Sequence, residues 1–175
     1  MATLVTLGLS AILGKDSEPS AGDFEETGYT AFGLTYEDTC TMSQDDPETT
    51  EFYAEEEDDP VEISEKQGKI TFAFSIMNPD ITTLTRLFGG TVATNIYAYP
   101  DTVATVEESV IIKPKKGLKF QVPRMKLVSK INAEFSKKGL LLIDVVGTVL
   151  KPNTTGLKKM YVTTVVAPTS GSSTP

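Results

Sequence analysis

Residues 69–90 read KITFAFSIMNPDITTLTRLFGG, and this stretch passes from a strand pattern into a helix pattern. Its first part places alternate apolar side chains on one face, namely Ile70, Phe72, Phe74 and Ile76. A period of two predicts a strand with one buried face. The later apolar residues recur at helical spacing, so we predict one short helix near residues 79–88, the only convincing helix of the sequence.

The two ends of this predicted helix have recognisable signals. Asn78 is a suitable N-cap, and Pro79 suits the first helical position because a proline there loses no intrahelical hydrogen bond. Gly89 and Gly90 predict the end of the helix, since glycine readily adopts the conformation that terminates helices.

The region that precedes this stretch predicts a long hairpin. Residues 31–43, AFGLTYEDTCTMS, alternate as a strand with an apolar face made of Phe32, Leu34, Tyr36, Cys40 and Met42. Residues 44–47 contain two Asp and a Pro and predict the turn. The returning arm is then ETTEFYAEEE, which carries the acidic run that continues through Asp59.

Further strand patterns follow the helix. We predict strands in TVATNIYAY, ESVIIKP, GLKFQVP and KKMYVTTVV, with a turn at residues 114–117 between the second and the third. Residues 124–136 alternate, and residues 140–150 pair with them through a tight turn. Because LLLIDVVGTVL is apolar on both faces, we predict a central strand that is covered on both sides.

These elements predict a mainly β fold of two packed antiparallel sheets, either a sandwich or a flattened barrel, with one short α-helix. We expect a polar N-terminal arm over residues 1–28, a single β domain over 29–167 and a disordered tail over 168–175. No stretch is long and apolar enough to cross a bilayer as a helix, so we expect no membrane partner.

The charge is divided along the chain. Residues 1–62 contain seventeen acidic residues and one basic residue, whereas residues 63–175 contain seven acidic and fifteen basic residues. The net charge of −8 is therefore the sum of −16 and +8. Such a chain can attract copies of itself, but the two parts could equally be solvated or neutralise each other within one fold.

The residue types needed for catalysis are scarce. The chain has no His and one Cys, and Cys40 lies on an apolar strand face, where a packed thiol is more common than a reactive one. We therefore expect no enzymatic activity, no catalytic residues and no cofactor. The run EEEDD could bind calcium, but adjacent acids in an extended segment alternate between faces instead of converging, so we expect no metal site.

A cluster of basic residues has two interpretations. It comprises Lys113, Lys115, Lys116, Lys119, Arg124, Lys126 and Lys130. Nucleic acid is one ligand for such a cluster, but the chain is acidic overall and only Phe120 adds an aromatic ring. A complementary acidic surface is the better candidate, and the same chain supplies one.

The order of these elements resembles that of a phage tail tube protein, also called a major tail protein. The resemblance covers about residues 30–166 and rests on YEDTC…QDDP…EEEDDP, on residues 69–90 and on IKPKKGLKFQVP. It implies a sandwich of two sheets flanked by one helix. Subunits of this kind form rings, usually of six, that stack into a tube around a lumen, and the tubes of contractile tails and type VI secretion share the fold.

The resemblance also implies the partners. These are further copies of the chain and other tail proteins, such as the tape measure and the tail terminator, with DNA only passing through the lumen during ejection. The protein would be a structural component of the virion tail, assembled in the host cytoplasm. An acidic lumen wall would let DNA slide without sticking, because affinity for phosphate comes from Lys and Arg.

A junction between rings is the other use for the acidic run. We expect acidic residues within 45–59 of one ring to approach basic residues of the next, with Lys115, Lys116, Arg124, Lys126 and Lys130 as candidates. Two other classes remain open. One is a β-sandwich subunit of a surface fibre or pilus, and the other is a calcium- or carbohydrate-binding module.

Overall fold

The computed structural model describes residues 5–20, 25–137 and 139–165. The predicted tail over residues 168–175 lies outside the described residues, as do residues 1–4 and 21–24 of the predicted arm. The elements in chain order are β1 (Leu7–Lys15), β2 (Thr30–Ala31), β3 (Thr41–Gln44), β4 (Glu48–Tyr53), β5 (Pro60–Lys66), β6 (Ile70–Ile76), α1 (Ile81–Phe88), β7 (Thr91–Ala93), β8 (Ile96–Ala98), β9 (Val106–Ala133), β10 (Leu141–Val149) and β11 (Tyr161–Val165).

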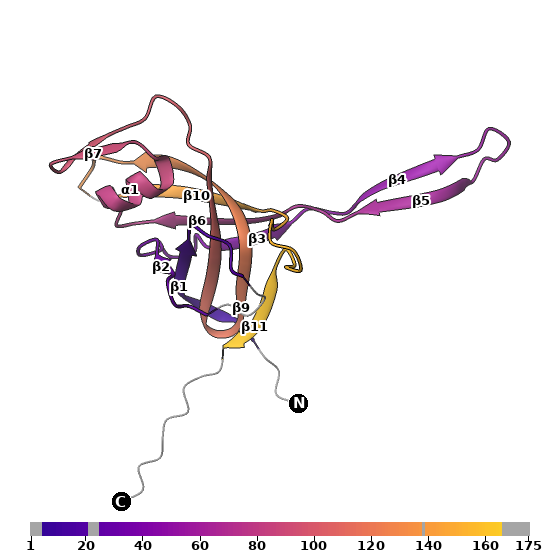
Figure 1. Cartoon of the computed structure of the whole chain (residues 1–175), viewed down its shortest axis with the longest axis horizontal. Coiled ribbons are helices and arrows are strands. Elements are labelled where there is room, and N and C mark those ends of the chain that lie inside the picture. Colours follow the sequence, from indigo (N-terminus) through magenta and orange to yellow (C-terminus); the bar gives the residue numbers. More distant parts are fainter. Residues whose placement is uncertain (1–4, 21–24, 138, 166–175) are drawn as a thin grey trace, which may run out of the picture.

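A seven-stranded antiparallel sheet forms the body of the molecule. Its strand order is β2-β1-β9-β10-β6-β3, and β11 pairs with β9 beside this path. The sheet curls into a half-barrel, and the two-stranded sheets β4–β5 and β7–β8 lie outside it (Figure 1). The prediction of a mainly β, antiparallel fold with one short helix is confirmed.

Strand β9 folds back on itself. It is 28 residues long, and its pairing with β1 ends at Lys116 while its pairing with β11 begins at Gly117 (Figure 1). The two arms contact each other, because Ser109 Oγ donates to the carbonyl oxygen of Val122. Gly117 has a φ of +106°, and a Cβ there would lie 2.4 Å from Thr6 Cα. This β9 bend (residues 114–117) stands where the sequence predicts a turn.

The core fills the concave side of the half-barrel. The predicted apolar face of β6 is buried, and it packs with Val122, Met125 and Leu127 of β9. Leu87 and Phe88 of α1 complete this cluster. Strand β10 is central in the sheet, as predicted, but only one of its faces is fully covered. Ile143 and Val145 are buried, whereas Val146 on the opposite face is exposed.

The predicted hairpin over residues 31–57 is wrong in its pairing. Residues 31–43 do not form one strand, because Gly33 (φ +132°) and Asp38 (φ +59°) interrupt the extended backbone between β2 and β3. Residues 44–47 do not reverse the chain. The register that pairs Thr41 with Ala73 continues unchanged to the pairing of Phe52 with Glu62.

One long hairpin therefore runs from the body into solvent. Its inner part, β3–β6, belongs to the large sheet, and its outer part, β4–β5, projects away from the body (Figure 1). Asp45 N donates to the carbonyl oxygen of Lys69 where the two parts meet. Gly68 is required there, since a Cβ would lie 1.8 Å from the Asp45 carbonyl oxygen. The acidic run forms the connection at the tip.

The helix begins two residues later than predicted. Asp80 is the N-cap, because its carboxylate accepts a hydrogen bond of 2.7 Å from Thr83 N–H. That bond lowers the pKa of Asp80. Asn78 has a different role, because its side-chain oxygen accepts a hydrogen bond of 2.6 Å from Leu34 N–H. The predicted end is confirmed, as Gly89 has a φ of +73° and closes the last turn.

Two other segments differ from their predicted form. TVATNIYAY forms the small hairpin β7–β8, which turns at Thr94 and Asn95 with positive φ at both. Within the predicted polar arm, residues 7–15 form β1, and Ile12 belongs to the core. The described part of that arm after β1, residues 16–20 and 25–28, is called the strap below.

Candidate assembly site

The acidic hairpin, residues 45–66, is the most isolated part of the described structure. Strands β4 and β5 contact each other but no other described strand or helix. Every residue of both strands is exposed. An isolated two-stranded hairpin is at best marginally stable in water. The rest of the described chain therefore adds little to the stability of this segment.

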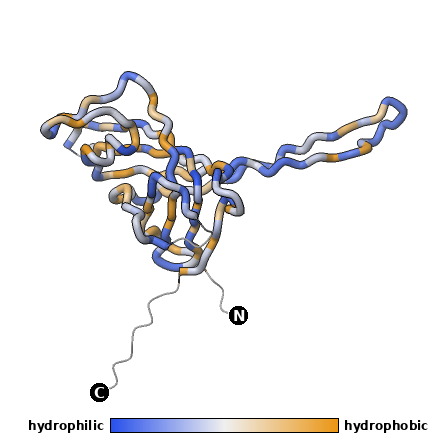
Figure 2. Tube along the Cα trace, viewed as in Figure 1, coloured by the Kyte–Doolittle hydropathy of each residue, from blue (hydrophilic) through white to orange (hydrophobic). Residues whose placement is uncertain are grey.

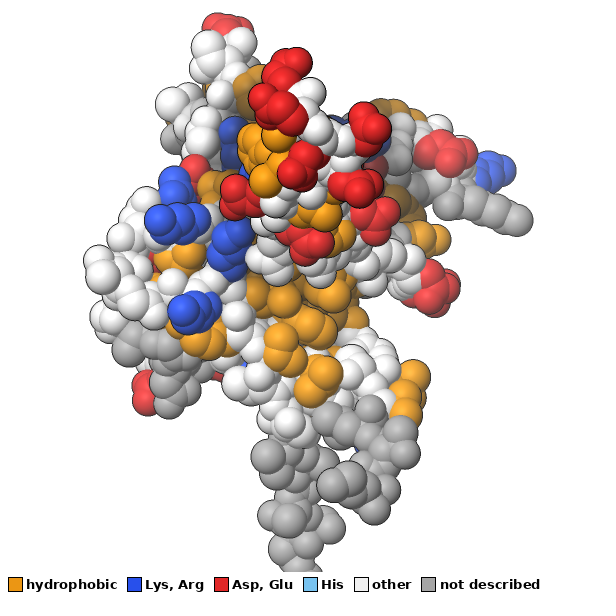
Figure 3. All heavy atoms as spheres, turned by 90° about the vertical axis from the view of Figure 1, so that its right-hand side faces the viewer, with side chains coloured by type: hydrophobic (Ala, Val, Ile, Leu, Met, Phe, Trp, Pro, Cys, Tyr) orange, Lys and Arg blue, Asp and Glu red, His pale blue; other side chains and the backbone are white. Residues whose placement is uncertain are grey.

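Charge on the acidic hairpin is strongly negative. Residues 45–66 contain eleven acidic residues and one basic residue, Lys66. The Lys66–Glu48 ion pair is long, at 3.8 Å, and exposed on both sides. Tyr53 Oη donates to Glu51 at 2.5 Å, which raises the pKa of Tyr53. Figure 3 shows these acidic side chains crowded over the hairpin.

Apolar side chains are interspersed among these acids. Phe52, Tyr53, Val61 and Ile63 are all more than half exposed. Figure 2 shows hydrophobic stretches on both strands of the hairpin. The register places Phe52 opposite Glu62 and Ile63 opposite Glu51, so each face carries both kinds of residue. A purely solvated charged arm would gain nothing from these four side chains, whereas an interface would bury them.

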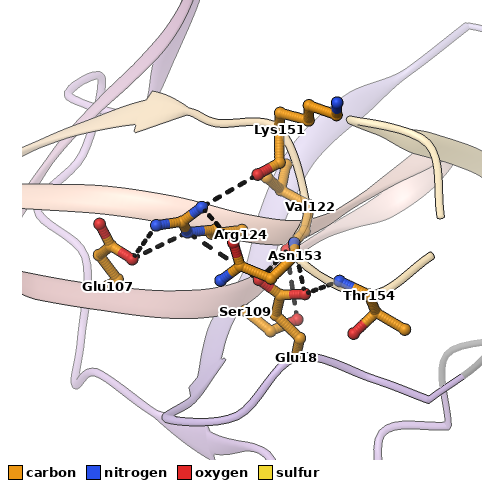
Figure 4. A network of polar contacts seen from close by, with 8 residues as sticks. All are labelled: Glu18, Glu107, Ser109, Val122, Arg124, Lys151, Asn153 and Thr154. Carbon is orange, nitrogen blue, oxygen red and sulfur yellow. Dashed lines mark hydrogen bonds and ion pairs between the residues drawn. The ribbon is translucent and has the colours of Figure 1, made fainter.

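Two acidic residues of the strap, Glu18 and Glu26, form hydrogen bonds and ion pairs within the fold. Glu18 accepts hydrogen bonds from the backbone N–H groups of Asn153 and Thr154, and it lies 3.9 Å from Arg124 (Figure 4). Burial alone would raise the pKa of Glu18, but these hydrogen bonds prevail and lower it. The sequence alone did not decide whether the acidic and basic parts of the chain neutralise each other within one fold. Glu18 is neutralised in this way, whereas the acidic hairpin is not neutralised by the basic residues of the body.

Glu26 is the second acid of the strap that is neutralised. Its carboxylate accepts a 2.9 Å hydrogen bond from Lys113 Nζ and lies 3.5 Å from Lys119. The bond from Lys113 is the main reason that the pKa of Glu26 is lowered. Lys113 and Lys119 of the basic cluster thus share one carboxylate, that of Glu26, as their ion-pair partner.

The five basic residues predicted to receive the acidic run do not form one surface. Arg124 is occupied by Glu107 at 2.8 Å and by Asn153, as Figure 4 shows. Lys130 lies 3.8 Å from Asp144. Within the described residues, Lys115, Lys116 and Lys126 make no ion pair. Lys126 lies on the second arm of β9, whereas Lys115 and Lys116 form the β9 bend.

The β9 bend is the more basic of these two places. It joins Lys115 and Lys116 to Lys113 and Lys119, with Glu26 as the described acid that contacts this group. Leu7 of β1 pairs with Lys116 and is exposed. The bend therefore combines positive charge with an apolar side chain, which complements the acidic hairpin.

A groove lies where the half-barrel stays open between β1 and β3. We call it the seam groove, and it has a volume of about 780 Å³. Its lining includes Leu9, Met42, Phe72, Ile112, Leu118 and Phe120. Cys40 also lines it and packs against the core, and burial raises the pKa of its thiol. No local sequence pattern predicted this groove, because its walls come from segments that are distant along the chain.

The described residues contain neither a cluster of metal ligands nor a membrane-spanning helix. There, no group of three or more His, Cys, Asp or Glu side chains is arranged to hold a metal ion. Within the same residues, no helix has the length and apolar character needed to span a bilayer.

No protein-family model matches the chain, and no curated protein matches it with significance.

Proposed function

We propose that this chain is a structural subunit of a phage tail tube that assembles itself into stacked rings of six around a lumen for DNA. One observation carries the proposal. The acidic hairpin projects from the body, contacts no other described element, and exposes four large apolar side chains among its acids. The order of the sequence elements, which resembles that of a phage tail tube protein, is the reason for proposing a tail tube as the class of assembly.

In this proposal, the acidic hairpin of one copy binds to the β9 bend of another copy. Attraction between eleven acids and the lysines of the bend guides the approach. Burial of Phe52, Ile63 and Leu7 then stabilises the contact. The two-layer packing predicted from the sequence belongs to this proposal, with the neighbour's hairpin supplying strands of the second layer.

The contact is heterologous, because it joins two unlike surfaces. Such contacts form closed rings or open stacks, depending on whether the rotation between copies closes. We propose that the stack is the tube wall and that acidic side chains near the lumen keep DNA mobile. Tape-measure and tail-terminator proteins would bind at its two ends in the virion tail. The proposed role involves no catalysis and no cofactor.

Charge reversal at the bend tests the proposal. Lys115→Glu with Lys116→Glu should abolish ring and tube formation in negative-stain images while the monomer stays folded by circular dichroism. Lys151→Glu with Lys158→Glu makes the same change of charge at two exposed lysines of another loop and should leave assembly intact. Normal tubes from the bend variant would contradict the proposed junction.

Rescue makes the test sharper. Adding Glu55→Lys and Glu56→Lys to the bend variant restores opposite charges across the junction and should recover part of the assembly. Images of the wild-type chain decide the class of assembly. Six-fold rings support the tail tube, whereas single-file fibres without a lumen would favour a pilus subunit.

A further inference from the structure

Two of the four lysines around the β9 bend are held by an acid from another part of the chain. Glu26 Oε2 lies 2.9 Å from Lys113 Nζ, and Glu26 Oε1 lies 3.5 Å from Lys119 Nζ. Lys113 precedes the bend and Lys119 follows it, so one carboxylate bridges the two arms of β9. Lys115 and Lys116 lie between them, are exposed, and have no ion-pair partner within the described residues.

The two bridged lysines lie on the outer face of β9. Their neighbours along the chain line the seam groove, namely Ile112, Pro114, Leu118 and Phe120. Successive side chains of a strand point to opposite faces, so Lys113 and Lys119 point away from the groove. Glu26 therefore contacts them from outside the half-barrel, on the surface where a second copy can approach.

The acidic hairpin of the same copy lies elsewhere. Its strands β4 and β5 contact no other described strand or helix. Figure 1 shows the hairpin leaving the body well away from the β9 bend. Among the described acids, Glu26 alone forms ion pairs with the lysines at the bend. Hairpin acids that replace it must therefore come from another copy.

The contact made by Glu26 is of a kind that exchanges easily. The side chain of Glu26 is 37% exposed and that of Lys113 is 34% exposed. Water screens an ion pair with this exposure, so the pair contributes little to folding. A neighbour's hairpin brings eleven acids together with exposed apolar side chains that gain from burial. It therefore has more to gain from the lysines than Glu26 has.

The chain on both sides of Glu26 is anchored without the lysines. On one side, the carboxylate of Glu18 accepts a hydrogen bond of 2.9 Å from Thr154 N–H. On the other side, Tyr29 Oη and Ser109 Oγ form a hydrogen bond of 2.7 Å. Tyr29 N–H also donates to the carbonyl oxygen of Glu26, which fixes the turn that presents this side chain. Exchange therefore requires only that the Glu26 side chain leaves the lysines.

We infer that Glu26 occupies, in the free chain, the place that an acid of the neighbour's hairpin takes on assembly. Lys113 and Lys119 then belong to the surface that binds the acidic hairpin, and Glu26 neutralises part of that surface beforehand. This inference rests on the proposed function, because it concerns the same junction. Its consequence is that Glu26 opposes assembly. A carboxylate that only clamped the two arms of β9 would instead leave assembly unchanged, or weaken it, when removed.

Removal of the Glu26 charge tests the sign of this effect. Glu26→Gln frees both lysines and should lower the protein concentration needed for assembly by about two- to fivefold, the size expected for one exposed ion pair. Glu25→Gln is the matched control, because Glu25 is exposed, carries the same charge and has no ion-pair partner within the described residues. It should change that concentration much less. Sedimentation measures the concentration, and circular dichroism checks that both variants are folded.

Carbodiimide crosslinking of the wild-type chain follows the exchange directly, because the reagent forms an amide between a carboxylate and an amine in contact. In dilute, unassembled protein, mass spectrometry should find Glu26 joined to Lys113. Tubes grown from a mixture of isotope-labelled and unlabelled copies should instead join Lys113 or Lys119 to hairpin acids of another copy. The yield of the product between Glu26 and Lys113 should fall severalfold in these tubes.

The outcomes separate this inference from the proposed function. An undiminished product between Glu26 and Lys113 in assembled protein would overturn the exchange and leave the tube proposal standing. So would a Glu26→Gln variant that needs as high a concentration for assembly as Glu25→Gln. Failure of the wild-type chain to assemble at any concentration would overturn the proposed function, and this inference with it.

Discussion

Arg86 of α1 and Glu108 of β9 form a two-point ion pair that ties the helix to the sheet. Arg86 Nε and Nη2 lie 2.7 and 2.5 Å from the two carboxylate oxygens of Glu108, whose side chain is 1% exposed. The guanidinium also lies 4.1 Å from the centre of the Phe32 ring. One side chain thereby joins α1, β9 and the segment after β2.

Removing Arg86 should destabilise the fold strongly. Arg86→Ala leaves the buried carboxyl group of Glu108 without its partner, and breaking a buried ion pair in this way typically costs about 3–5 kcal/mol of unfolding free energy. Urea denaturation measures this directly. Lys66→Ala breaks an exposed pair and should change the unfolding free energy by less than about 1 kcal/mol. Similar losses for the two variants would mean that the Arg86 pair does not organise the body.

The capping role of Asp80 can be separated from the role of Asn78. Asp80→Ala removes the acceptor for Thr83 N–H and should cost about 1 kcal/mol of unfolding free energy. The loss should be accompanied by faster amide exchange at Thr83. Asn78→Ala should instead speed exchange at Leu34, whose N–H loses its partner. The opposite assignment of the two exchange effects would restore Asn78 as the cap.

Acid should loosen the strap before it unfolds the body. The pKa values of Glu18 and Glu26 are lowered in the folded state, so their contribution to stability is complete above their ordinary value of 4.5 and is lost as pH falls through the lower folded values. The protection of the Asn153 and Thr154 amides, relative to their intrinsic exchange rates, should therefore fall as the pH drops below about 4.5. Glu18→Gln should already exchange faster at neutral pH and should flatten this dependence. An unchanged pH profile in that variant would exclude Glu18 as the cause.

The acidic hairpin should gain protection only on assembly. Its amides are bonded across a two-stranded ribbon that contacts no other described element, so local opening should be nearly free in the monomer. Hydrogen exchange over residues 48–66 should be fast in monomers and at least about tenfold slower in assembled material. Residues 70–76 of β6 serve as the internal control, since they are protected in both states. Equal exchange of the hairpin in both states would contradict its burial between copies.

A side chain at position 68 should destabilise the junction between the body and the acidic hairpin. Gly68→Ala forces a Cβ against the Asp45 carbonyl oxygen, and overpacking of this kind typically costs about 1–3 kcal/mol. The change should lower the thermal midpoint and weaken assembly. Gln67→Ala, one residue away, should have little effect on either. A stable, normally assembling Gly68→Ala protein would show that the strands can separate there without cost.

Local periodicity predicted much of the fold. The alternation in residues 70–76 predicted a half-buried strand, and the glycines at 89 and 90 predicted the end of the helix. Residues 114–117 were predicted as a turn and form the β9 bend. Each of these features depends on residues close in sequence, so a short window contains the information needed.

The candidate site was only partly visible in this way. The acidic run and the basic cluster were evident from charge alone. The sequence did not show that Glu18 and Glu26 neutralise part of the negative half, since their partners lie far along the chain. The apolar residues Phe52 and Ile63 within the acidic hairpin were the available signal that this arm is more than a solvated loop.

The sequence by itself determined that this is an antiparallel β protein with a short helix and a divided charge, because alternation, caps and charge are local properties. Only the tertiary structure decided that β4 pairs with β5 beyond the edge of the body, that Arg86 meets Glu108, and that the sheet stays open at the seam. The physical reason is that strand partners and buried ion pairs are chosen by competition among distant segments. An alternating pattern specifies which face of a strand is buried but does not specify the strand beside it.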